Sequence, residues 1–118
     1  MLDVMPKDGT ATVKIQADVW ELNICAPVPD LAKLRRVRTA VWSARTCMAI
    51  GTCAGVPVFW CHNEGQVTIL IGQDSETWDV AFIIPAETTD EIVEQLEHEA
   101  GTRFDSGDRP AADMNPLW

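Results

Sequence analysis

The stretch QVTILIGQDSETWDVAFIIP, residues 66–85, contains two neighbouring strand candidates and sets the fold class. Its two apolar runs cover residues 66–72 and 77–85, and the polar segment QDSE separates them. A loop of about four residues between two such runs is typical of a β-hairpin. The stretch therefore predicts a pair of antiparallel strands.

The second arm of this hairpin carries apolar residues on both of its faces. Ala81 and Ile83 share one face with Asp79. The opposite face is entirely apolar and consists of Trp78, Val80, Phe82 and Ile84. A strand of this kind is expected in the centre of a sheet, or covered by helices on one side and by a partner on the other.

Two further regions have strand patterns. Residues 11–27 alternate between apolar and polar positions, but the phase slips near Val19 and Trp20. Because a one-residue slip exchanges the two faces, we expect either a bulge or bend there, or two short strands. Residues 56–60 form the other candidate, with Pro57 at the strand start or on an edge because proline cannot donate to the ladder.

A first helix is predicted after Pro29, with Asp30 as its N-cap and Leu31 as its first residue. Its apolar positions recur with the period of an amphipathic helix. These positions are Leu34, Val37, Val41, Ala44 and Met48. Gly51 is expected to end the helix, and basic side chains cover its other sides.

A second helix is predicted from the capping-box pair Thr88 and Glu91, whose side chains bond to free backbone amides at the helix start. The helix is expected to end before Gly101, and His98 lies near that end, where positive charge is favoured. Its buried side is predicted to consist of Ile92, Val93, Leu96 and Ala100.

These elements occur in the order strand, helix, three strands, helix. The order predicts an α+β fold: a mostly antiparallel sheet of about four strands, in the order β-α-β-β-β-α, with two helices packed on one face. We assign residues 1–101 to a single domain and residues 102–118 to an extended C-terminal tail. The tail ends in Leu117 and Trp118, which are expected to pack on the domain or on a neighbouring subunit.

The chain carries a net charge of −9, and this charge is unevenly distributed. Residues 1–46 hold seven basic and five acidic residues, whereas residues 47–118 hold two basic and thirteen acidic ones. A surface this negative disfavours nucleic acid and favours a basic partner, or simply solubility. Because no apolar run reaches the ~18 residues of a membrane span and no signal-peptide pattern is present, we expect a cytoplasmic protein without membrane insertion.

Three cysteines and a histidine lie close together in residues 46–62: Cys47, Cys53, Cys61 and His62. Zinc sites usually bring cysteines in pairs of the form C-x2-C, whereas the spacings here are C-x5-C and C-x7-C. Cys61 and His62 are also expected to point to opposite faces of a strand. We therefore predict that the cysteines are small buried apolar residues, with a metal site or thiol centre formed by these residues as the alternative.

The sequence contains none of the motifs G-x-S-x-G, Walker A, G-x-G-x-x-G or H-E-x-x-H. We therefore predict a non-enzymatic protein–protein interaction module without a cofactor, whose partner is another protein or further copies of itself. The basic residues of the first helix can instead pair with the acidic second helix of the same chain. The residues predicted to bind the partner are Arg35, Arg36, Arg38, Glu94, Glu97, Leu117 and Trp118.

The order of elements and the acidic second helix resemble those of small bacterial immunity proteins, which neutralise toxins. The resemblance implies a small acidic inhibitor or immunity-like protein. A phage or bacterial assembly subunit is the other class that fits an acidic chain with an ordered C-terminus.

Overall fold

The computed structural model describes residues 1–100 and 114–116. Its main feature is an antiparallel sheet in which each strand, from β1 to β7, pairs with the next strand along the chain, while β8 pairs with β4. The strands are β1 Leu2–Lys7, β2 Thr10–Gln16, β3 Glu21–Pro27, β4 Thr46–Cys53, β5 Val56–Asn63, β6 Gln66–Gly72, β7 Trp78–Pro85 and β8 Met114–Pro116.

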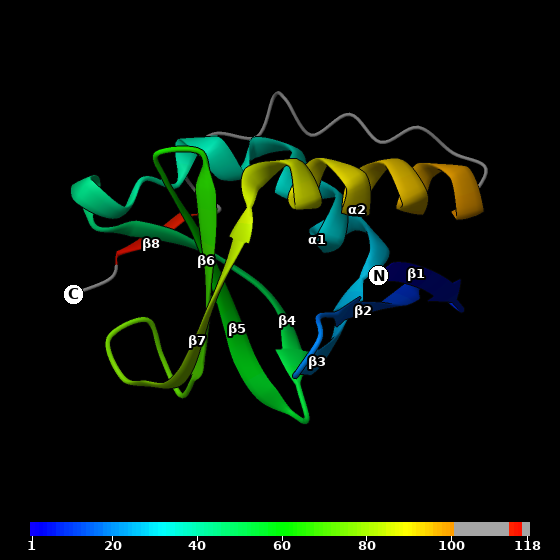
Figure 1. The fold of residues 1–118 in the computed structure, drawn as a ribbon, viewed down its shortest axis with the longest axis horizontal. Helices are drawn as coiled ribbons and strands as arrows, with labels where there is room; N and C mark the ends of the chain where they lie inside the picture. Colours follow the sequence, from blue (N-terminus) through cyan, green and yellow to red (C-terminus); the bar gives the residue numbers. More distant parts are fainter. Residues whose placement is uncertain (101–113, 117–118) are drawn as a thin grey trace.

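The helices cover one end of this sheet. A short helix, α1 (Val28–Ala32), and two 3-10 segments, η1 (Lys33–Thr39) and η2 (Trp42–Ala44), connect β3 to β4. The long helix α2 (Ala86–Ala100) follows β7 directly and extends over the sheet towards β1 (Figure 1). None of the helices in the described ranges is long and apolar enough to cross a membrane.

The prediction of about four strands in the order β-α-β-β-β-α is wrong, because the described residues form a sheet of eight strands, of which seven pair in consecutive order. Three strands, β1, β4 and β8, were not recognised. In β1 only one residue, Val4, is buried, so its alternation is weak. In β4, Met48 continues the helical spacing of the preceding segment but pairs with Trp60 of β5, and this pairing overrides the local pattern.

Three smaller predictions are corrected by the same structure. The first helix does not extend to residue 48, because Arg45 has a left-handed backbone (φ 58°) and β4 begins at the next residue. The second helix does not start with a capping box: it begins at Ala86, and the Thr89 hydroxyl donates to the Ala86 carbonyl. Finally, β7 is not a central strand, because it lies at one end of the strand order.

Other parts of the prediction are confirmed. The hairpin of residues 66–85 forms, with β6 and β7 paired over their length. The phase slip in residues 11–27 marks two short strands rather than one bent strand, because Ala17 and Trp20 close a turn through a backbone hydrogen bond of 2.9 Å.

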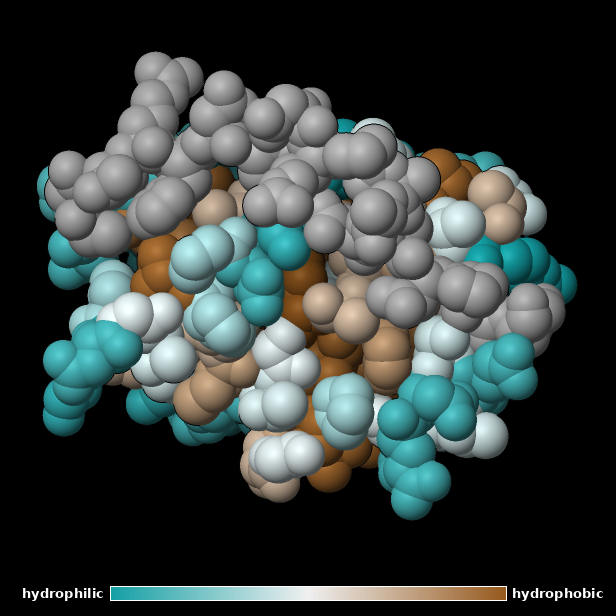
Figure 2. Space-filling view, turned by 180° about the vertical axis from the view of Figure 1, so that it is seen from behind, coloured by the Kyte–Doolittle hydropathy of each residue, from teal (hydrophilic) through white to brown (hydrophobic). Residues whose placement is uncertain are grey.

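The core lies between one face of the sheet and the helices. Trp60 is fully buried there, and its indole N–H donates to the Ile50 carbonyl at 3.0 Å, so the one polar atom of this ring is satisfied. From α2, Ile92 and Leu96 are fully buried in the same cluster. On the side opposite to the view in Figure 1, hydrophobic residues reach the surface in a band bordered by hydrophilic ones (Figure 2).

The sheet turns sharply between β3 and β4, where Cys25 and Thr52 are paired across the two strands. Gly51 makes the turn possible. It has φ +80°, and a Cβ atom built on it would lie 2.7 Å from the Cys25 carbonyl oxygen and 2.9 Å from a methyl group of Ile24. Only a residue without a side chain allows β3 and β4 to approach this closely.

Gly51→Ala is therefore expected to lower the free energy of unfolding by roughly 3 kcal/mol or more, since left-handed strain and overpacking add. Gly55→Ala is the matched control, because Gly55 has φ +83° but no atom within 4 Å of the added Cβ. The control should lose only about 1–2 kcal/mol. Urea denaturation of both variants measures the difference, and equal losses would show that the β3–β4 approach is not tight.

Candidate functional site

The basic residues of the β3–β4 connection lie against α2. The Arg38 guanidinium donates two hydrogen bonds to the Asp90 carboxylate, at 2.8 and 3.0 Å, and this carboxylate raises the pKa of Arg38. Arg35 forms an ion pair with Glu97, and Arg36 of the same segment is half-buried. Two of the predicted binding arginines therefore have partners within the chain, as does Glu97.

Three further carboxylates of α2 border the same surface depression as Asp90. Glu87, Glu91 and Glu94, named here the acidic face, are all exposed and border a shallow depression of about 570 Å³ beside Pro85. Glu87 acts electrostatically on Arg38, but within residues 1–100 and 114–116 neither Glu91 nor Glu94 forms an ion pair. The structure thus places the predicted residue Glu94 in an acidic surface in which Asp90 is paired with Arg38, whereas Glu91 and Glu94 form no ion pair with another described residue.

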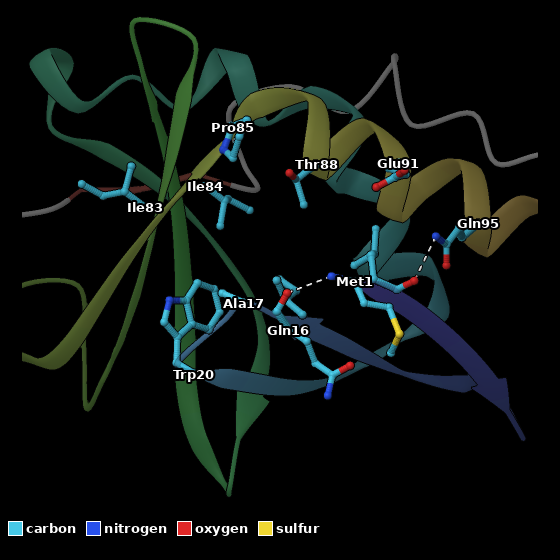
Figure 3. A pocket seen from close by; sticks show the side chains of 12 residues that line it. Met1, Gln16, Ala17, Trp20, Ile83, Ile84, Pro85, Thr88, Glu91 and Gln95 are labelled. Carbon is cyan, nitrogen blue, oxygen red and sulfur yellow. Dashed lines mark hydrogen bonds between the residues drawn. The ribbon is translucent and has the colours of Figure 1, made fainter.

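Next to the acidic face is a pocket of about 390 Å³ at the seam between β7 and the β1–β2 end of the sheet. Figure 3 shows β7 on one side of this seam pocket, α2 above it and the Met1–Gln16 region on the other side. Apolar and polar groups both face it. Its apolar walls include Leu2, Ile15, Trp20 and Ile84, and its polar lining includes Thr88, Glu91 and Gln95.

Two contacts maintain the shape of the seam pocket. The rings of Trp20 and Phe82 pack with their centroids 4.8 Å apart, which joins the β2–β3 turn to β7. The Gln95 side-chain amide donates to the Leu2 carbonyl at 3.2 Å, which joins α2 to β1. The pocket was not predicted from sequence, because its walls come from four separate elements.

The side of β7 that faces away from β6, named here the β7 free edge, runs along the seam pocket. The Ala86 amide donates to the Gly65 carbonyl at 2.9 Å, which directs the backbone groups of even-numbered β7 residues towards β6. Those of Ala81 and Ile83 therefore face outwards, where no other described strand pairs with them. Ile83 is 62% exposed and Val80 44%, so apolar side chains accompany the unpaired backbone.

The opposite edge of the sheet, on β1, is protected. The Met1 carbonyl accepts from the Gln16 amide, so even-numbered residues of β1 face outwards. Of these, Leu2 has its carbonyl bonded to Gln95, and Pro6 has no N–H to offer. Proteins usually block exposed edges in such ways. Within residues 1–100 and 114–116, β7 lacks the protection that β1 possesses.

The cysteine group is divided by the fold. Cys47 and Cys61 lie with Phe59 and Leu70 in a small buried cluster, whereas Cys53 packs against the main core. His62 accepts a hydrogen bond from the Gly65 amide at 3.2 Å through Nε2. The part of the chain that the structure describes contains no group of three or more His, Cys, Asp or Glu side chains arranged to hold a metal ion.

Burial keeps two of the thiols protonated. Desolvation raises the pKa of Cys47 to about 11, although a hydrogen bond to Ser75 opposes the shift. Desolvation and the nearby Cys47 raise the pKa of Cys61 to about 11 as well. A thiol with so high a pKa is a poor nucleophile at neutral pH, so these two residues behave as apolar core residues.

The predicted terminal binding residues, Leu117 and Trp118, lie outside the described residues. From the predicted tail, the structure describes β8, whose three residues pair with Thr46–Met48 of β4.

Comparisons with known proteins leave the site to be interpreted from its own chemistry. No family model matches this chain, and no match is found among the curated proteins or the solved structures. The resemblance to immunity proteins was based on the order β-α-β-β-β-α, which the structure does not have. The resemblance therefore carries no further argument.

The raised thiol pKa values predict a loss of stability at high pH. An unfolded thiol releases its proton near pH 9, but the folded thiols keep theirs until about pH 11. The contribution of the two protonated thiols to the free energy of unfolding is present below pH 9 and is lost as the pH rises to 11. The loss is up to about 2–3 kcal/mol per thiol.

Urea denaturation across this pH range measures the effect. The variant Cys47→Ala/Cys61→Ala should lose less stability between pH 9 and 11 than the unmodified chain. Cys25→Ala, at an exposed position, is the control and should keep the full pH dependence. If the double variant has the same pH dependence as the control, the two buried thiols are not its cause.

Proposed function

We propose that this chain is a protein-binding module that recognises a basic region of another protein through the acidic face and the adjoining seam pocket. The support is chemical: Glu91, which forms no ion pair with another described residue, lines a pocket with apolar walls, next to a strand edge with which no other described strand pairs. Interfaces of this composition combine an apolar centre with a charged rim.

The observation that carries the proposal is the division of the carboxylates on α2. Asp90 and Glu97 meet Arg38 and Arg35 inside the chain, which explains their presence without a partner. Glu91 and Glu94 have no such explanation among the described contacts. They add negative charge to a chain that already has a net charge of −9, and a cationic partner would relieve this repulsion.

A basic protein fits this surface better than a nucleic acid, because phosphate groups would be repelled by the same carboxylates. A basic enzyme that the chain inhibits and a basic subunit with which it assembles are both compatible with the proposal. The two differ in the consequence of binding, since only the first loses an activity when the complex forms.

The test is a charge reversal on the acidic face. Glu91→Lys/Glu94→Lys is expected to weaken partner capture from the native host at least about tenfold, because attraction is replaced by repulsion. Binding by the unchanged chain should also weaken as salt is raised. Quantitative mass spectrometry of the captured proteins measures both effects.

Glu64→Lys/Glu76→Lys is the matched control, since it makes the same change in charge at exposed positions outside the acidic face. The control should retain the partner that the α2 variant loses. A partner that is retained equally by both variants, or a capture that is insensitive to salt, would contradict the proposal.

A further inference from the structure

We propose that the β7 free edge binds an extended segment of the partner as an additional strand, with basic residues of that segment against the acidic face. The inference rests on the proposed function and specifies how the partner is held.

The backbone of β7 offers a ready set of hydrogen-bonding groups. The N–H and C=O groups of Ala81 and Ile83 point away from β6. Pro85 has no backbone N–H to donate. It is the last residue of β7, a position where an edge strand tolerates proline. An extended segment laid along this row would satisfy these groups as a strand does in a sheet.

The seam pocket lies where side chains of such a segment would point. In an added strand, alternate side chains face the interior of the sheet. At the Ile83–Pro85 end of β7 this interior is the seam pocket, with Trp20 and Ile84 among its walls. The pocket therefore suits one apolar side chain of the incoming segment, while the backbone hydrogen bonds set its register.

The negative charge at this end of β7 indicates which residue types the rest of the bound segment should contain. Immediately after Pro85 the chain enters α2, and the seam pocket and the acidic depression share Pro85, Thr88 and Glu91 as lining residues. A segment that leaves the pocket in this direction passes Glu91 and Glu94. Lysine or arginine is expected at that position, because its charge would be paired and its stem would cover apolar surface.

A second copy of this chain fits the edge less well. In an antiparallel pair of β7 strands, the start of one strand lies beside the end of the other. The residues at and before the start of β7 include Asp74, Glu76 and Asp79, so a second copy would place acidic residues against Glu91 and Glu94. This like-charge apposition favours a basic segment of a different protein.

The experiment uses linear peptides selected from a random display library against the full chain. Residue-resolved amide hydrogen exchange by NMR is then measured on the full chain, free and with a selected peptide bound. In the free chain, the amides of Val80, Phe82 and Ile84 are expected to be protected, and those of Ala81 and Ile83 to exchange fast.

Peptide binding should slow exchange of the Ala81 and Ile83 amides at least about tenfold and leave the even-numbered amides nearly unchanged. This alternation is specific for strand addition, since a ligand held only by the seam pocket or by charge has no reason to protect every second amide. The selected peptides should share an apolar residue followed or preceded by lysine or arginine.

Two variants test the same edge independently. Ile83→Pro removes an outward N–H without removing a hydrogen bond to β6, and it should weaken peptide binding at least about tenfold. Ile83→Val keeps the N–H and should bind within about twofold of the unchanged chain. An unchanged amide spectrum outside the β7 region confirms that Ile83→Pro is folded, and the exchange measurement on the unchanged chain does not depend on this variant.

The remaining outcomes would overturn the inference. If the library yields no peptide, or if a bound peptide leaves the Ala81 and Ile83 amides unprotected, strand addition is wrong. If the free chain sediments as a dimer with these amides already protected, a second copy is the occupant. In each case the proposed function is judged separately, by whether partner capture depends on Glu91 and Glu94.

Discussion

The packing of α2 across the opening of the sheet is the contact on which the rest of the molecule depends. A meander of consecutive antiparallel strands has two ends, and here β1 and β7 are kept near each other by one helix. Ile92 and Leu96 supply the buried apolar contact, and the bond from Gln95 to Leu2 attaches the far end. The size of the seam pocket follows directly, because α2 sets the separation between its walls.

The carboxylates of the same helix fall into two groups, according to whether they form an ion pair with another described residue. Carboxylates on the side of η1 are neutralised by arginines, which stabilises the docking of a connection that has little regular structure of its own. Exposed ion pairs of this kind contribute modestly, about 0–1 kcal/mol each, so their role is mainly to orient α2. Within the described residues Glu91 and Glu94 form no ion pair, and this part of α2 is the surface that we propose for recognition.

Features encoded locally were predictable from the sequence. The hairpin of residues 66–85 combines a period of two with a polar loop, and α2 has a long apolar stripe, so neither depends on distant partners. The segment around residues 41–48 was not predictable in this way. Its spacing fits a helix, but Arg45 adopts a left-handed conformation and Met48 pairs across to Trp60, which only the assembled sheet imposes.

The candidate site was predictable only in part. Glu94 and the apolar residues on both faces of residues 77–85 pointed to a partner, and one of the two explanations offered for that strand was a covering partner. The edge position of β7 and the seam pocket could not be inferred, because Trp20, Ile84 and Gln95 come together from distant parts of the chain. No local pattern reports which strand will be last in a sheet.

The consecutive order of the strands also has a consequence for the synthesis of the protein. The hairpins β1–β2, β2–β3, β4–β5, β5–β6 and β6–β7 can each form as soon as the second strand has left the ribosome, because these pairings are local in sequence, whereas β3 and β4 are separated by residues 28–45. The apolar face of these strands nevertheless stays open to water until α2 emerges, since Ile92 and Leu96 complete the core. The nascent chain therefore spends most of its translation as an uncovered sheet, the stage at which chaperone contact or aggregation is decided.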